Sequence, residues 1–105
     1  MTEKGNFAIT QETVQAGIKL TIKGRIDSTN AVELEYKLDK ALQGGKVNII
    51  LNMLRVEYLC STGIRAILKA YKNVKESGGK LGIEMPSECV KNVLGMVALN
   101  EMLVH

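Results

Sequence analysis

Residues 47–64 run VNIILNMLRVEYLCSTGI, in which a strand is followed by the start of a helix. The first five of them are almost continuously apolar, a pattern typical of a central strand covered on more than one side. Residues 52–60 lose this regularity and predict a loop, with Tyr58 and Leu59 tucked under the surface. Apolar residues then recur at helical spacing along residues 64–74. The stretch therefore predicts a strand, a loop and a helix in succession, as in α/β folds.

The first residues of the chain predict a β-hairpin. Apolar and polar residues alternate along residues 7–9 and again along residues 18–22, which is typical of half-exposed strands. Residues 15–17, Gln-Ala-Gly, favour a turn between them. We therefore expect the two strands to pair in antiparallel fashion.

A loop and a helix are expected between the hairpin and the central strand. Gly, Asp, Ser and Asn gather in residues 24–30 and indicate the loop. Apolar residues at helical spacing predict the helix over residues 31–42, and the Gly-Gly pair at 44–45 ends it. Either Ser28 or Asn30 can serve as its N-cap.

After the second helix, the chain predicts one more strand and one more helix. The second helix ends at the Gly-Gly pair at 78–79, and residues 81–85 then alternate as a strand. Pro86 breaks that strand, and Ser87 is placed to cap the third helix. The apolar face of that helix comprises Val90, Val93, Leu94 and Val97, and a short packing turn or helix is expected around Leu99, Met102 and Leu103.

The element order is therefore β-β-α-β-α-β-α, an α/β fold in a single domain. Strand–helix–strand connections place parallel neighbours in a small mixed sheet. We expect the helices to pack mainly on one face of the sheet and to leave the other face partly solvated. The 105 residues suit one domain over residues 1–105, with a core from about 7 to 103.

Composition excludes several classes of protein. Fourteen Lys and Arg against 11 Asp and Glu give a charge of +3, too mild to indicate a nucleic-acid binder. The 2 Cys and 1 His are too few for a zinc site. Two lone cysteines and the absence of a secretory signal in the sequence point to the cytoplasm. No apolar run approaches the ~20 residues of a membrane helix, so we expect no membrane association.

Residues 58–63, Tyr-Leu-Cys-Ser-Thr-Gly, are the best candidate for a functional site. They lie at the start of the second helix, where backbone N–H groups lack partners and the helix dipole favours anions. The hydroxyl of Ser61 or Thr62 can cap the helix there, or it can accept a phosphate. Gly63 allows close packing or exposes backbone to a partner.

The motifs of an enzyme are absent. The only histidine is His105 at the end of the chain, so neither Cys60 nor Ser61 has a predicted base. No GxSxG elbow, GxxxxGK loop or GxGxxG loop occurs. We therefore expect no catalytic residue, no cofactor and no metal.

Four basic residues follow one another along the second helix. They are Arg65, Lys69, Lys72 and Lys75. Such a stripe is typical of a solvated helix face, and it is also a candidate contact for an anionic partner.

Taken together, these segments resemble a STAS domain, and in particular the bacterial anti-sigma-factor antagonists. The resemblance rests on the order and spacing of residues 24–31, residues 47–52, residues 56–64, the Gly-Gly pair at 78–79 and Pro86-Ser87. It extends from about residue 7 to residue 103. The most specific part is the Ser-Thr-Gly sequence after the central strand.

The resemblance implies a non-enzymatic switch in a partner-switching pathway that regulates transcription. The unmodified antagonist binds an anti-sigma factor that is also a serine kinase, and this frees a sigma factor. Phosphorylation of one serine loosens the complex, and a metal-dependent PP2C-type phosphatase resets it. ATP and Mg²⁺ belong to the partner, and the antagonist is expected to be a monomer or a weak homodimer.

The family's phosphoacceptor falls on Ser61, with Thr62 as the alternative hydroxyl. Asp27 and Thr29 match the loop that commonly lies beside the acceptor. The family usually has Asp just before the acceptor, whereas this chain has Cys60. The partner-binding residues implied are Asp27, Thr29, Cys60, Ser61, Thr62, Gly63 and Arg65.

Two alternative functions fit the same resemblance. One is a structural STAS scaffold in a larger signalling complex, for which a stable large assembly is the expected sign. The other is a STAS domain that senses a nucleotide or a lipid, for which thermal stabilisation by that ligand is the expected sign.

Overall fold

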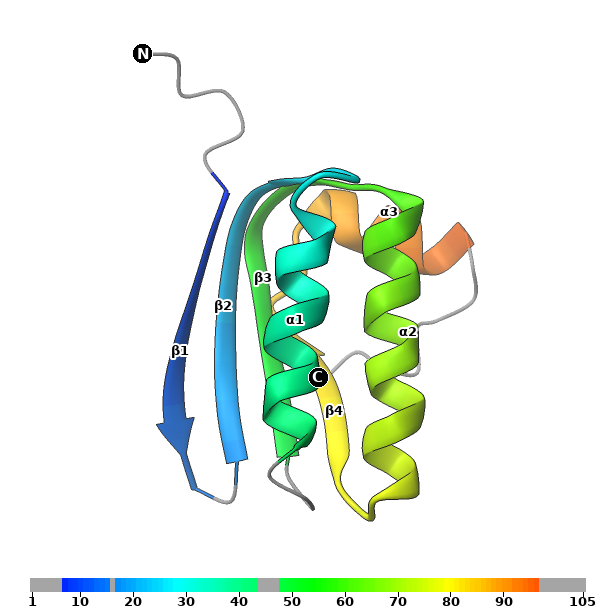
Figure 1. Ribbon diagram of the computed structural model, residues 1–105. Coiled ribbons are helices and arrows are strands. Elements are labelled where there is room, and N and C mark those ends of the chain that lie inside the picture. Colours follow the sequence, from blue (N-terminus) through cyan, green and yellow to red (C-terminus); the bar gives the residue numbers. More distant parts are fainter. Residues whose placement is uncertain (1–6, 16, 44–47, 97–105) are drawn as a thin grey trace.

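The computed structural model describes residues 7–15, 17–43 and 48–96, which form a four-stranded sheet and three helices (Figure 1). The predictions for the Gly-Gly pair at 44–45, for Val97 and for residues 99–103 concern positions outside these residues. The observed order confirms the predicted β-β-α-β-α-β-α succession. The elements are β1 (Ala8–Val14), β2 (Gly17–Ile26), α1 (Ala31–Leu42), β3 (Asn48–Leu59), α2 (Ser61–Glu76), β4 (Lys80–Glu84) and α3 (Glu88–Met96).

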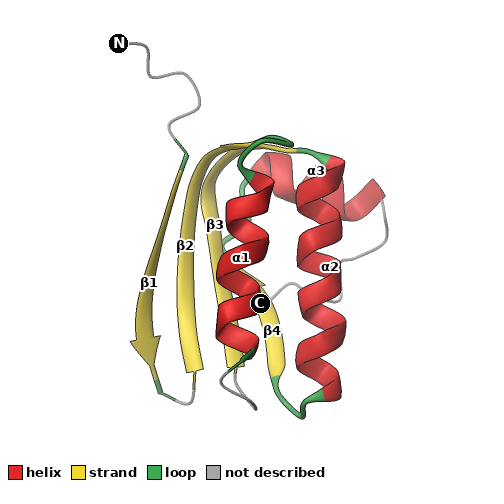
Figure 2. Cartoon of the chain, in the orientation of Figure 1, coloured by secondary structure: helices red, strands yellow, loops and turns green. Residues whose placement is uncertain are grey.

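The sheet is mixed and has the strand order β1-β2-β3-β4. β1 pairs with β2 in antiparallel fashion and confirms the hairpin, whereas β2, β3 and β4 run parallel to one another. Each parallel connection carries a helix, and α1 and α2 lie side by side over the same face of the sheet (Figures 1 and 2). Because successive parallel crossovers have the same hand, helices that advance across a sheet in one direction share a face.

The third helix packs against β3. The backbone N–H of Ser87 donates to the carbonyl of Met53 at 3.2 Å, which places the start of α3 beside the middle of β3, just beyond the end of β4. The Ser87 hydroxyl accepts from the N–H of Val90 at 3.2 Å and confirms the predicted cap. Across the described part of the chain, no helix has both the length and the apolar content to cross a membrane.

The core lies between the helices and the inner face of the sheet. Leu20, Ile22 and Ile26 of β2 are fully buried there, and Leu34 of α1 and Ile67 of α2 pack into the same cluster. The intervening residues of β2 turn to the outer face, as the alternation predicts. The sheet therefore has one buried and one partly solvated face.

The prediction of a loop over residues 52–60 is wrong, because β3 continues to Leu59. Its buried residues Met53, Val56 and Leu59 recur every third position, not every second. The register with β2 explains this spacing. β3 has one extra residue between the partners of Thr21 and Lys23, and a second extra residue between the partners of Gly24 and Arg25. Each extra residue forms a β-bulge.

The loop expected over residues 24–30 also begins later than predicted. β2 runs to Ile26, so only residues 27–30 connect it to α1. Because β2 and β3 are longer than predicted, both end at the edge of the sheet at which α1 and α2 begin.

Candidate functional site

The carboxyl ends of β2 and β3 bring two candidate segments together. Ile26 and Leu59 are register partners at the ends of these parallel strands. The N–H of Cys60 donates to the carbonyl of Ile26 at 2.9 Å and joins the two chain segments directly. The loop over residues 27–30 and the first turn of α2 are therefore neighbours.

The first of these segments is a loop ordered by its own side chains. Asp27 Oδ1 accepts from the N–H groups of Thr29 and Asn30, both at 3.0 Å. Asn30 Oδ1 accepts from the N–H of Asp27 at 2.9 Å, and Asn30 Nδ2 donates to the carbonyl of Arg25 at 2.8 Å. Asn30 is the N-cap residue of α1, but its side chain ties the loop together and does not cap the helix. Thr29 is exposed, whereas the Asp27 carboxylate is committed to the loop.

The second segment is the start of α2. The helix begins at Ser61, and Cys60 is its N-cap in an extended conformation with φ −83° and ψ 171°. No side-chain hydrogen bond caps this helix, so the expectation that Ser61 or Thr62 caps it is wrong. Both hydroxyls lie inside the helix, Ser61 one position and Thr62 two positions after the N-cap, too late to accept from its first free N–H groups.

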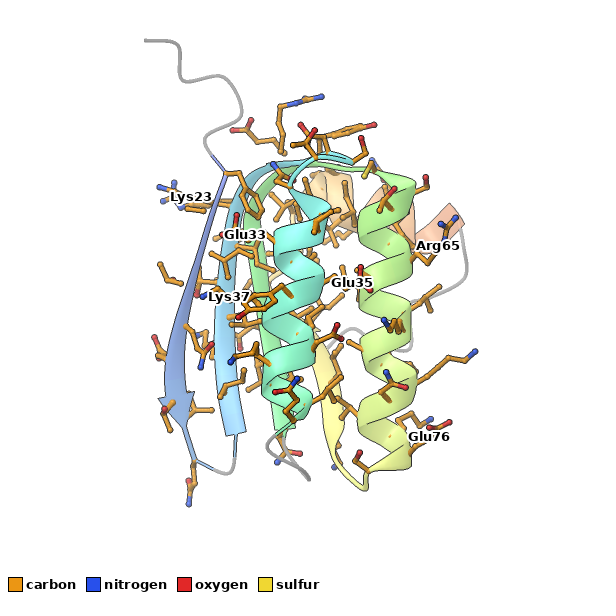
Figure 3. The ribbon with its side chains drawn as sticks, viewed as in Figure 1. Lys23, Glu33, Glu35, Lys37, Arg65 and Glu76 are labelled. Atoms are coloured by element: carbon orange, nitrogen blue, oxygen red, sulfur yellow. The ribbon has the colours of Figure 1, made fainter. Side chains whose placement is uncertain are left out.

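The two hydroxyls differ in accessibility. Ser61 is exposed, whereas Thr62 is half-buried. Thr62 lines a groove of about 180 Å³ between α1 and α2, together with Glu35, Arg65 and Lys69. Figure 3 shows Glu35 on α1 extending toward α2, on the side of this groove. An incoming protein therefore reaches the Ser61 hydroxyl more easily.

Gly63 is buried and serves close packing. A Cβ at this position would lie 2.8 Å from Cδ1 of Leu59 and 2.9 Å from Cγ2 of Ile26. The glycine therefore allows α2 to approach the ends of β2 and β3. Its role is close packing, and not the exposure of backbone to a partner.

The basic residues of α2 are partly engaged within the molecule. Lys69 Nζ lies 2.9 Å from Oε2 of Glu35. This hydrogen bond, with the negative charges of Asp39 and Glu35, raises the pKa of Lys69 above its ordinary 10.5. Lys75 Nζ lies 5.2 Å from the centroid of the Tyr71 ring. Arg65 is exposed, one helical turn after Ser61.

Tyr58 does not lie under the surface as expected. Its side chain is 40% exposed, and the guanidinium carbon of Arg25 lies 4.4 Å from its ring centroid. Sequence reasoning missed this pair because it assigned Tyr58 to a buried loop. The bulges of β3, which turn consecutive residues outward, were not visible in the sequence pattern.

The fold and the arrangement of the site agree with a comparison to known protein families. The sequence profile of the STAS domain matches residues 8–105, and the chain belongs to the STAS domain family.

Relatives in this family include the anti-sigma-B factor antagonist of Bacillus subtilis, which is 33% identical over 87 residues. The aligned region covers 82% of this chain and 78% of that protein. The putative anti-sigma factor antagonist BtrV of Bordetella bronchiseptica is 26% identical over 73 residues, which cover 70% of this chain and 63% of BtrV.

Solved structures show the same fold. The anti-sigma factor antagonist SpoIIAA in its unphosphorylated form superposes with a TM-score of 0.82, at 21% identity, covering 92% of this chain and 86% of that one. The phosphorylated form of the Bacillus cell fate determinant SpoIIAA gives 0.77, at 20% identity, covering 92% and 89%. The predicted small mixed sheet with three helices is therefore confirmed as the STAS fold.

Proposed function

We propose that this chain is an anti-sigma-factor antagonist whose binding to an anti-sigma factor is switched off by phosphorylation of Ser61. The observation that carries the proposal is the exposed Ser61 hydroxyl at the first position of α2, where it caps nothing. Family membership and the names of the relatives support the role. A sigma factor freed by this binding would change transcription, and we infer from this role that the protein acts in the cytoplasm.

In the unmodified state, the ordered loop and the first turn of α2 form the binding surface. A neutral hydroxyl loses little on burial when the partner supplies a hydrogen bond. The partner is an anti-sigma factor with serine kinase activity, and it brings ATP and Mg²⁺. The residues that meet the partner in this proposal are Asp27, Thr29, Cys60, Ser61, Thr62 and Arg65. Gly63, which the resemblance also implied, is buried and instead positions the helix.

Phosphorylation is a balanced transfer between partner and antagonist. The kinase moves the γ-phosphoryl group of ATP to Oγ of Ser61, the hydroxyl proton leaves to a base of the kinase, and ADP is released. A PP2C-type phosphatase reverses this modification with water and releases inorganic phosphate. In this proposal the antagonist supplies the accepting hydroxyl, and the kinase and the phosphatase supply the catalytic groups.

The phosphate releases the partner without unfolding the antagonist. It adds about −1.5 to −2 charges at the N-terminus of α2, where free N–H groups and the helix dipole favour an anion. Arg65 lies four positions after Ser61, so its guanidinium is on the same helix face. Burying this charge against the partner requires desolvation, and each ~1.4 kcal/mol of penalty weakens binding tenfold.

Two features of the site refine the proposal. Ser61 is preferred to Thr62 as the acceptor, because Thr62 is half-buried in the groove between α1 and α2. Cys60 occupies the position where the family usually has Asp, so the kinase of this system recognises the acceptor without that carboxylate.

The experiment compares antagonist variants in binding to the purified anti-sigma factor of the same organism, by titration calorimetry. We expect Ser61→Ala to bind as the wild type and Ser61→Asp to bind at least about tenfold more weakly. Ser77→Asp is the matched control, because it adds the same charge at the exposed C-cap of the same helix. Equal binding by Ser61→Asp and the wild type contradicts the proposal, and thermal unfolding verifies that each variant is folded.

A further inference from the structure

A second surface lies on the outer face of the sheet, at the carboxyl ends of β2 and β3. Four exposed side chains form it, and we call it the outer basic patch: Lys23, Arg25, Arg55 and Tyr58. Lys23 pairs in register with Arg55, and Arg25 with Tyr58. Their buried neighbours on β2 face the helices, so these side chains face away from them. Figure 3 shows Lys23 on the side of β2 remote from α1.

The two bulges of β3 build this patch. The first places Arg55 opposite Lys23, and the second places Tyr58 opposite Arg25. On β2, Gly24 lies between Lys23 and Arg25 with a φ of 93°, a conformation that favours glycine. Bulges reorient side chains and occur preferentially beside functional sites. The backbone irregularity thus gathers three cations and one aromatic ring on one small surface.

This arrangement is unfavourable for stability. Like charges directly opposite each other on paired strands destabilise a sheet, and Lys23 and Arg55 are such a pair. Among the described residues, the ion pairs are Lys19–Glu84, Lys69–Glu35 and Lys91–Glu88, so none compensates the patch. The exposed Glu57 is the acidic neighbour on β3. Proteins retain such local conflicts where a surface has a function other than stability.

We propose that the outer basic patch docks an acidic segment of a partner protein. The guanidinium of Arg25, stacked 4.4 Å from the Tyr58 ring centroid, is held as a planar fork that suits a carboxylate. Arg and Tyr are enriched at the energetic centres of protein interfaces. Leu54, 49% exposed and adjacent to Arg55, adds an apolar contact.

The same observations disfavour a membrane or a nucleic acid. Basic clusters that bind anionic lipids contain about 4–8 Lys and Arg, more than the patch offers. Proteins that bind single-stranded nucleic acids stack bases on several free aromatic rings, whereas Tyr58 is the one ring of the patch and Arg25 occupies one of its faces. The inference does not depend on the modification of Ser61.

The test measures binding of a fluorescein-labelled peptide of Glu and Gly to the full chain by fluorescence anisotropy. We expect salt-sensitive binding by the wild type and a loss of about tenfold or more in Lys23→Gln/Arg25→Gln/Arg55→Gln. The matched control is Lys37→Gln/Lys40→Gln/Lys80→Gln, which removes the same charge from α1 and from the start of β4. The control is expected to bind within about twofold of the wild type, because its lysines lie outside the patch and act on the peptide only through the long-range field, which salt screens.

Several results would overturn the inference. They are no binding of the acidic peptide by the wild type, an equal loss in the control variant, and tighter binding of phosphatidylserine vesicles or of an oligonucleotide than of the peptide. Thermal unfolding distinguishes loss of the patch from loss of the fold. The patch variant is expected to unfold at the same or a higher temperature, because the opposed charges of Lys23 and Arg55 are removed.

Discussion

Two residues in the first turn of α2 have opposite environments. Ser61 is exposed, whereas Gly63 is enclosed by Leu59 and Ile26. The glycine sets how closely the helix approaches the strand ends, and that approach determines where the serine lies at the surface. The Ser-Thr-Gly sequence thus combines a packing requirement with an accessible hydroxyl.

Gly63→Ala is expected to destabilise the protein through overpacking. The new Cβ would lie 2.8 Å from Leu59 and 2.9 Å from Ile26, and overpacking typically costs about 1–3 kcal/mol. Gly95→Ala is the control, because it is also helical and its Cβ would meet no described atom within 4 Å. Urea denaturation should therefore separate the two variants by about 1–3 kcal/mol. Equal stability would contradict the packing role of Gly63.

At the scale of elements, the sequence predicted every described strand and helix but not how far β2 and β3 extend. Apolar periodicity is visible where a strand alternates regularly, as along β2. In β3 the two bulges space Met53, Val56 and Leu59 by three residues, a pattern that resembles neither a strand nor a helix. Bulges arise from the register with β2, which is a long-range property that a local pattern does not contain.

The candidate site was predictable in position but not in detail. The Ser-Thr-Gly sequence falls at the start of α2, as expected. The capping role failed because the helix begins at Ser61, and a shift of one residue at a helix boundary changes which side chain can cap. The partnership of Arg25 with Tyr58 depended on the unforeseen bulge.

Cys60→Asp is expected to stabilise the protein by about 0.5–2 kcal/mol at neutral pH. Cys60 already has the backbone conformation of an N-cap but provides no capping bond, and Asp is a strong N-cap. A capping carboxylate has a lowered pKa, so the gain is present above the unfolded value of about 3.9 and is lost as the pH falls below it. Thermal unfolding at neutral and at acidic pH measures both effects.

Cys60→Ser is the control for this prediction. Its hydroxyl caps without a titrating charge, so its gain should change much less with pH. If Cys60→Asp is no more stable than the wild type at neutral pH, the N-cap assignment is wrong.

At the scale of the whole molecule, two ion pairs connect elements that are distant in the sequence. Lys69 and Glu35 join α2 to α1, and Lys19 and Glu84 join β2 to β4 across β3, at 2.9 and 2.8 Å. In each pair the hydrogen bond to the carboxylate is the main cause that raises the lysine's pKa above 10.5. These pairs tie the helices to each other and the outer face of the sheet together.

The pairs predict a decline of stability at alkaline pH. A lysine whose pKa is raised by folding contributes fully below its unfolded value of 10.5 and loses that contribution as the pH rises through the folded value. The difference in stability between the wild type and Lys19→Gln/Lys69→Gln should stay constant at neutral pH and shrink above 10.5. Urea denaturation across this range checks it, and a difference independent of pH would contradict the assignment of these pairs.

The central claim is that Ser61 carries the regulatory phosphate. The most direct measurement is intact-mass spectrometry of the protein purified from its own cells, with peptide mapping around Ser61, in several growth states. We expect a phosphate on Ser61 in the states in which the anti-sigma factor holds its sigma factor, and unmodified protein in the others. Absence of phosphate from Ser61 in every state, or a phosphate confined to Thr62, would contradict the account.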